Sequence, residues 1–313
     1  MNTTITDNTL AVLLPPIARN AYKYTRGSLL VLAGSNSFPG AAVLAAQAAA
    51  RGGAGYVTLA IPETVAAIAQ AHLLSVPVIA APATKGAFAA DAWKDVCAQA
   101  THVDAIVLGP GLTVTSSTSA FVEVVLREAT VPVLVDADAL NILAACWAQS
   151  GVVLPFASGV QTGSASTSAS NFGDCTPSAP ASAADPCYIL TPHAGELKRL
   201  LDATGLADVQ CLANALNAVV VAKGPETSIV SPTQMRSVSS GTPALAKAGT
   251  GDVLSGLIGS LVAQGASPFM AAVAGVELHA RAGRIAERLF SRRSVCAEDV
   301  IQAVPHVLRE LEG

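Results

Sequence analysis

The chain has 313 residues, of which 51% are hydrophobic and only 13% are charged. Its formal net charge is −4 and it contains no basic run, so the sequence gives no electrostatic case for binding nucleic acid. So few charged residues suit a large buried core and extensive contacts between subunits. Any nucleotide is therefore expected to bind locally, through loops and helix ends.

The N-terminal residues and the cysteines predict a cytoplasmic protein. Residues 1–8 are polar and lack the basic segment and apolar core of a signal peptide. The cysteines form no C-x-x-C pair, which argues against a metal or redox site and favours free thiols in a reducing compartment. The six are Cys97, Cys146, Cys175, Cys187, Cys211 and Cys296.

Short apolar segments alternate with alanine-rich helical segments from about residue 28 onward. Apolar strands separated by helices predict an α/β fold in which a mostly parallel central sheet carries helices on both faces. We predict a single domain over residues 1–313, with ligands at the carboxyl ends of the strands. A helix is expected over 40–51, and strands over 28–33, 56–60, 76–80, 105–108, 133–135, 188–190, 218–221 and 227–230.

Residues 157–186 depart from this pattern. They are mostly Ala, Ser, Thr, Gly and Pro, and so few bulky side chains cannot offset the entropy of ordering the segment. We predict a flexible surface insertion between two core strands, with an interdomain linker as the alternative.

The C-terminal part predicts helices over 271–289 and 297–312. No charged residue lies between Asp252 and Glu277, a length that suggests a membrane span. However, Gln264, Gly265 and Pro268 divide the segment into helices too short to cross a bilayer. We therefore predict buried helices and no contact with a membrane.

Four polar or glycine-containing turns follow predicted strands directly. Gly109-Pro110-Gly111 forms either a tight turn or a close backbone approach to a ligand. Asp136 and Asp138 either cap a helix or act on a metal through water. His193 is a satisfied turn histidine, a general base or a ligand contact, and Lys223 forms a salt bridge or contacts a nucleotide. The chain contains neither G-x-G-x-x-G nor G-x-x-x-x-G-K-[ST], so a Rossmann or Walker-type phosphate loop has no support.

The segment Ala248-Gly249-Thr250-Gly251-Asp252 precedes an apolar pattern of helical spacing. Glycine N–H groups at a helix N-terminus form a ready site for an anion, and Asp252 could take a proton from an attacking hydroxyl. The alternative is that Asp252 caps the helix.

Taken in order, these segments resemble the ADP/ATP-dependent NAD(P)H-hydrate dehydratase family of the ribokinase-like fold, in its standalone bacterial form. The resemblance covers about residues 22 to 290 apart from the insertion. It depends on three motifs in combination: D-A-D-A-L-N at 136–141, T-P-H-x-G-E at 191–196 and G-T-G-D-V-L at 249–254.

The resemblance implies repair of the (S)-hydrate of NADH or NADPH, with ADP or ATP as phosphoryl donor, Mg²⁺, and release of AMP and phosphate when ADP is used. Asp252 would be the catalytic base, and the N–H groups of Gly249, Thr250 and Gly251 would form the anion hole. The hydrated cofactor would contact Ala41, Gly111, His193 and Asp252. The nucleotide would contact Lys223, Gly224, Pro225, Glu226, Thr227 and Gly251.

The resemblance also implies a homotetramer. Because the chain begins almost at the dehydratase segment, we expect the epimerase domain that is fused to it in some relatives to be absent and a separate NAD(P)H-hydrate epimerase to be the partner. Thr113 stands where the family often has a further glycine, which leaves open how closely this loop approaches the substrate. Two alternatives remain: a kinase of the same fold that acts on a sugar or vitamin precursor, and a non-catalytic nucleotide-binding regulatory protein.

Overall fold

The computed structural model describes residues 5–100, 102–150 and 188–312, so the predicted insertion over 157–186 lies outside the described residues. The central sheet has nine strands in the order β11-β10-β9-β8-β7-β6-β1-β2-β3, and it is parallel except at β10 and β11. The strands are β1 (Ser28–Leu32), β2 (Tyr56–Pro62), β3 (Val78–Ala81), β6 (Ala105–Leu108), β7 (Val133–Val135), β8 (Tyr188–Leu190), β9 (Ala218–Ala222), β10 (Thr227–Val230) and β11 (Met235–Val238). A separate hairpin is formed by β4 (Ala83–Thr84) and β5 (Ala87–Phe88).

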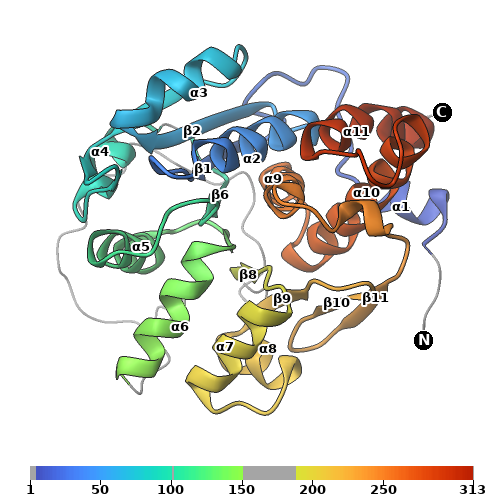
Figure 1. The fold of residues 1–313 in the computed structure, drawn as a ribbon. Helices are drawn as coiled ribbons and strands as arrows, with labels where there is room; N and C mark the ends of the chain where they lie inside the picture. The colour runs from blue at the N-terminus through green and yellow to red at the C-terminus, as the bar shows by residue number, and fades with distance from the viewer. Residues whose placement is uncertain (1–4, 101, 151–187, 313) are drawn as a thin grey trace.

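Helices cover both faces of this sheet, as predicted (Figure 1). One face carries α1 (Asp7–Leu13), α2 (Pro39–Arg51), α3 (Ala66–His72), α9 (Thr250–Ala263), α10 (Pro268–Leu289) and α11 (Ala297–Glu312). The other carries α4 (Ala92–Gln99), α5 (Ser116–Glu128), α6 (Asp138–Ser150), α7 (Ala194–Thr204) and α8 (Val209–Leu216). Short 3₁₀ turns at Glu63–Val65 (η1) and Pro243–Leu245 (η2) precede α3 and α9.

The strands form because nearly every residue in them is apolar and buried, and their side chains alternate between the two faces. In β1, Leu29 and Val31 pack into the core under α2 and α9, whereas Leu30 and Leu32 pack into the core on the opposite face. A strand buried on both faces needs this unbroken apolar pattern, and the pattern made these strands predictable from the sequence.

The segment without charges forms two helices, α9 and α10, separated at Gln264 to Ser267, as predicted. Within the part of the chain that the structure describes, no helix combines the length and apolar character needed to cross a bilayer. The prediction missed β11 and the β4–β5 hairpin. Met235 in β11 is exposed, so this edge strand lacks the continuous apolar pattern of the central ones.

Helix α9 lies against α2 at a separation that only a glycine allows. A Cβ added at Gly256 would lie 2.2 Å from the carbonyl oxygen of Ala45 and 2.9 Å from the Cβ of Ala48. The position of α9 on the sheet, and with it the position of its N-terminus, therefore depends on the absence of a side chain here.

We predict that Gly256→Ala destabilises the protein. Alanine would add about 1 kcal/mol of helix propensity, but the overpacking against Ala45 costs about 1–3 kcal/mol. We expect the net effect to be a lower free energy of unfolding, measured by urea denaturation. Gly40→Ala in α2 is the matched control, because nothing lies within 4 Å of its added Cβ. Equal stability of Gly256→Ala and the wild type would contradict this packing.

Candidate active site

The predicted motifs meet at one edge of the sheet. Strands β1, β6, β7, β8 and β9 are adjacent and parallel, so their carboxyl ends lie side by side. Backbone contacts tie the following loops together: Gly34 N–H donates to the Pro110 carbonyl at 2.8 Å, and Lys223 N–H donates to the Pro192 carbonyl at 2.8 Å. Segments far apart in the sequence thus form one continuous surface at this edge.

A largely buried ion pair lies at the centre of this edge. Lys223 Nζ is 2.8 Å from Asp136 Oδ1, and the Ser255 hydroxyl donates to Asp136 Oδ2 at 2.6 Å. Asp136 is only 1% exposed. Burial alone would raise its pKa, but the charge of Lys223 and the hydrogen bonds it receives outweigh burial and lower the pKa, so Asp136 stays ionised.

Lys223 is held in its charged form by the same pair. Burial opposes its charge, yet Asp136, followed by Glu196 and Asp252, raises the pKa of the ammonium above its ordinary value. The Asp136 side chain thus accepts from Lys223 and Ser255 and does not act as a helix cap, whereas its contact with a metal through water stays a prediction. The salt bridge considered for Lys223 is present.

Asp252 is the third residue of α9, whose N-cap is Gly249, so the interpretation of Asp252 as the cap is wrong. Burial raises the pKa of Asp252 to about 7, and the negative charge of Asp136 adds to this, while Lys223 partly opposes it. A carboxyl group with a pKa near neutrality can accept and return a proton at physiological pH, which is what general base catalysis requires.

The turn into α9 presents backbone N–H groups next to a cation. Gly249 has a φ of +90°, and a Cβ there would lie 2.8 Å from Leu44 Cδ1, so both conformation and space require glycine. A Cβ added at Gly251 would lie 3.6 Å from Lys223 Nζ, which places the ammonium beside the first turn of the helix. Free N–H groups, the helix dipole and a lysine together favour an anion at this point.

Of the three residues predicted to form the anion hole, Thr250 is partly engaged elsewhere. Its hydroxyl donates to the carbonyls of Leu245 at 2.7 Å and Lys247 at 2.8 Å, and its N–H lies 3.4 Å from the Lys247 carbonyl. Gly251 is in the first helical turn, where an N–H group has no partner within the helix. Its N–H is therefore the best-placed donor.

His193 is the N-cap of α7, which matches the interpretation as a satisfied turn histidine. Its Nδ1 accepts from the N–H groups of Gly195 at 3.0 Å and Glu196 at 3.4 Å, while Glu196 Oε2 accepts from the His193 N–H. Nδ1 is thus occupied as an acceptor, and the ring is 56% exposed, with Nε2 3.3 Å from Glu196 Oε1. This arrangement leaves the ring free to contact a ligand but does not favour a general base. A β-bridge places His193 beside Lys223.

Ala41 and Gly111, two predicted substrate contacts, are also brought together. A Cβ at Gly111 would lie 2.9 Å from the Cβ of Ala41, and Gly111 has a φ of +65°. Further along this loop, Thr113 donates its N–H to Asp138 Oδ2 at 2.9 Å, and its hydroxyl lies 2.8 Å from that of Ser35. Asp138, the first residue of α6, therefore anchors this loop.

The remaining predicted nucleotide contacts form the turn between β9 and β10. Gly224, Pro225 and Glu226 are exposed, and the Thr227 hydroxyl donates to the Gly224 carbonyl at 3.2 Å. The turn thus projects from the end of β9 beside Lys223 and is open to a ligand.

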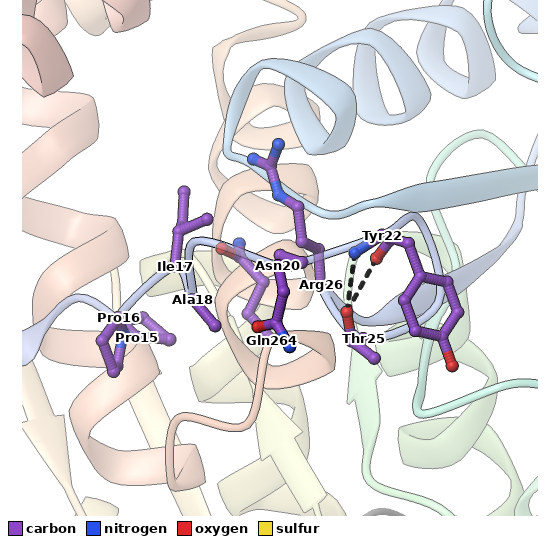
Figure 2. A pocket seen from close by; sticks show the side chains of 10 residues that line it. Pro15, Pro16, Ile17, Ala18, Asn20, Tyr22, Thr25, Arg26 and Gln264 are labelled. Atoms are coloured by element: carbon purple, nitrogen blue, oxygen red, sulfur yellow. Dashed lines mark hydrogen bonds between the residues drawn. The ribbon is translucent and has the colours of Figure 1, made fainter.

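No predicted site residue lines the cavity shown in Figure 2. This cavity has a volume of about 210 Å³ and is formed by residues between Pro15 and Arg26 together with Gln264. Two of its polar side chains hold the fold, since Arg26 donates to the Gly53 carbonyl and Gln264 to the Gly52 carbonyl. It is also smaller than the ~300–1,000 Å³ typical of small-molecule sites.

The described residues also include no group of three or more His, Cys, Asp or Glu side chains placed to hold a metal ion. Asp136, the strongest carboxylate candidate, already accepts from Lys223 and Ser255.

Sequence reasoning did not single out Ser255 or His279, and it noted Glu196 only as a neighbour of His193. Ser255 follows Asp252 by three residues, so both lie on the same side of α9, and a polar residue in an apolar helix was the available signal. His279 is buried in α10, and nothing in its local sequence points to the edge of the sheet.

A family model described as NAD(P)H-hydrate dehydratase matches residues 29–154 and 176–306. The chain belongs to this family. It is 36% identical, over 98% of its length, to the bifunctional NAD(P)H-hydrate repair enzyme of Salinibacter ruber, and it covers 53% of that protein. The chain thus spans about half the length of the bifunctional relatives that it matches.

Two further relatives match along most of their length. The ADP-dependent (S)-NAD(P)H-hydrate dehydratase of Xanthomonas campestris pv. campestris is 29% identical over 92% of this chain and 90% of that protein. The ADP/ATP-dependent NAD(P)H-hydrate dehydratase of Bacillus subtilis, crystallised with ATP and Mg²⁺, has a TM-score of 0.72 and 28% identity, and the match covers 98% of each chain. A ribokinase-like protein of Enterococcus faecalis, 18% identical with a TM-score of 0.76, supports the ribokinase-like fold.

We predict that Asp252→Asn stabilises the protein in a pH-dependent way. The pKa of this carboxyl rises from 3.8 to about 7 on folding, so the folded state holds the proton more tightly than the unfolded state. Asp252 therefore costs stability progressively as the pH rises from about 4 to about 7, and asparagine does not.

The measurement is the free energy of unfolding of both proteins at pH 5 and pH 8. We expect the advantage of Asp252→Asn to be larger at pH 8. Asp202→Asn, at an exposed position of α7, is the control and should show no such change. If Asp252→Asn raised the free energy of unfolding equally at both pH values, the pKa of Asp252 would not be raised on folding.

Proposed function

We propose that this protein catalyses the ADP-dependent dehydration of the (S)-hydrate of NADH or NADPH, a lyase reaction that repairs the damaged cofactor. The observation that carries the proposal is Asp252, a half-buried carboxyl with a pKa of about 7, which lies in the first turn of α9 beside its N–H groups and Lys223. Family membership supports the same reaction.

In the proposed first step, the ring hydroxyl of the hydrate loses its proton to Asp252. Its oxygen attacks the terminal phosphorus of ADP, and the bond to the bridging oxygen breaks to release AMP. The charge on the transferring phosphoryl group is stabilised by Lys223 and by the N–H groups of Gly249 and Gly251. In the second step the ring C–O bond breaks as phosphate leaves, and loss of a proton from the neighbouring carbon restores the double bond.

The binding roles follow the arrangement of the loops. Ala41, Gly111 and His193, with Asp252, would contact the hydrated cofactor, and the turn from Lys223 through Gly224, Pro225, Glu226 and Thr227, with Gly251, would hold the nucleotide. Mg²⁺ would enter bound to the nucleotide phosphates, where it neutralises their charge. We also propose a homotetrameric, cytoplasmic protein with one domain over residues 1–313 that works with a separate epimerase.

The decisive experiment is a repair assay with hydrated NADH or NADPH, run with ADP and with ATP in parallel. We expect the absorbance of the reduced nicotinamide to return while ADP is converted to AMP and phosphate in equal amounts. In Asp252→Asn this turnover should be lost, whereas ADP should still raise the melting temperature by mass action. A phosphorylated product that accumulates would instead identify a kinase, and ADP binding without any turnover would identify a regulatory protein.

The pH dependence of kcat/KM gives a further prediction. Because Asp252 must be ionised to act as a base, we expect activity to rise with pH around pH 7. Asp136→Asn removes the neighbouring negative charge and leaves Lys223 unopposed, and both changes lower the pKa of Asp252. The acid limb of the profile should therefore move to lower pH in this variant. A limb that stays near pH 7 in a folded Asp136→Asn variant would contradict the electrostatic role of Asp136.

A further inference from the structure

An exposed phenylalanine borders the candidate site and has no role in the chemistry above. Phe38 ends the loop that follows β1, and it is 54% exposed. It is also the N-cap of α2, where its side chain makes no cap hydrogen bond. Serine, threonine, aspartate or asparagine would stabilise a helix at this position, whereas phenylalanine has no side-chain acceptor to do so. Since the ring neither caps the helix nor is buried in the core, local stability does not account for it.

The fold holds Phe38 directly against two of the proposed substrate contacts. A Cβ added at Gly111 would lie 2.8 Å from the Cβ and from the carbonyl oxygen of Phe38, and 2.9 Å from the Cβ of Ala41. Because position 111 has no side chain, Phe38 and Ala41 both approach its backbone closely. The surface formed by Ala41 and Gly111 therefore continues without a break to Phe38.

Hydrogen bonds fix the backbone that carries Phe38. Its N–H donates to the Ser35 carbonyl at 3.2 Å, and the Asn36 N–H donates to the Gly86 carbonyl at 2.7 Å. The Asn36 side chain accepts from the Thr64 hydroxyl at 2.6 Å. The loop is thus ordered before any ligand binds, which reduces the entropy lost on binding.

Helix α2 connects Phe38 to the anion loop. Leu44 lies further along this helix, and its Cδ1 would be 2.8 Å from a Cβ added at Gly249, the N-cap of α9. The rise from Phe38 to Leu44 is about 9 Å along the helix axis. One substrate ring, together with the reach of the Phe38 side chain, can bridge this separation. A ring that rests on Phe38 can therefore present a substituent to the first turn of α9, which carries Asp252.

We propose that Phe38 is a substrate-binding residue that packs against the hydroxyl-bearing nicotinamide ring of the hydrated cofactor and so directs the ring hydroxyl toward Asp252. The inference rests on the proposed dehydration. The conjugated part of that ring is flat, and flat rings pack on aromatic side chains in offset stacks or edge to face. Val114 is 48% exposed and adds apolar surface to the loop that contains Gly111.

The first test measures binding without turnover. Hydrated NADPH is titrated into the protein by calorimetry in the absence of ADP, so that no phosphoryl group can be transferred. We expect Phe38→Ala to weaken binding about tenfold, as when a stacked ring loses its aromatic partner, and Phe38→Tyr to bind like the wild type. The hydrate of reduced nicotinamide mononucleotide, which lacks the adenylate half, should show the same loss.

The outcomes distinguish the role of Phe38 from the proposed function. A loss seen only with hydrated NADPH would place Phe38 at the adenine ring and overturn the proposal. Wild-type binding that Phe38→Ala leaves unchanged would overturn the role of Phe38 alone. Failure of the wild type to bind either hydrate would refute the proposed function and this inference together.

The second test is steady-state kinetics with ADP. We expect KM for the hydrate to rise about tenfold in Phe38→Ala, whereas KM for ADP should stay the same because the proposed ADP site lies at the turn after β9. An equal rise in both KM values would contradict a contact with the hydrate. Tyr22→Ala is the matched control, because Tyr22 is also an exposed aromatic residue but borders the cavity at Gln264, beyond the C-terminal end of α9.

Melting temperature and oligomeric state complete the comparison. Because Phe38 is exposed and does not cap α2, Phe38→Ala should keep the melting temperature of the wild type. Its oligomeric state, measured by light scattering, should also be unchanged. Dissociation of Phe38→Ala into smaller species would assign the ring to a contact between copies of the chain and overturn the proposal.

Discussion

The buried pair of Asp136 and Lys223 is the interaction on which the candidate site depends. It joins the end of β7 to the end of β9, and Ser255 extends it to α9, so one ion pair fixes three separate elements relative to one another. Removing two charges from water is expensive, and a buried salt bridge adds little net stability compared with apolar packing. Its value here is electrostatic, because an ionised Asp136 raises the pKa of Asp252 while the ammonium of Lys223 favours an anion in front of α9.

The unusual composition of the chain follows from how α9 is held. Glycine and alanine allow α2 and α10 to approach α9 closely, as the contacts at Gly256 and Gly275 show. Larger side chains would move the helix outward, and the backbone N–H groups at its start would no longer lie beside Lys223. A sequence that is half hydrophobic yet poor in aromatic residues is therefore suited to the precise placement of a helix terminus.

The parts of the site that could be predicted are those set by short-range pattern. Apolar strands followed by small or polar residues gave the strand ends, and parallel topology brings such ends to one edge, so Asp136, His193 and Lys223 were found. Tertiary partners could not be predicted in this way. The pairing of Lys223 with Asp136 depends on how β7 and β9 lie in the sheet, and the contact of Ser255 with Asp136 depends on the rotation of α9. The alternative that Asp252 caps α9 was wrong because the helix begins earlier, with Gly249 as its N-cap.

Thr113 shows how the chain accommodates its departure from the family pattern. Its φ of +66° lies in the left-handed region, which is costly for a β-branched residue and ordinary for the glycine that the family often has. Asp138 accepts from its N–H, the Thr118 hydroxyl donates to its carbonyl, and its own hydroxyl lies beside that of Ser35. These contacts offset the backbone strain, so the loop keeps the conformation that a glycine would adopt and Gly111 stays against Ala41. The D-A-D motif thus has two roles: Asp136 provides the negative charge at the site, and Asp138 anchors the loop that borders it.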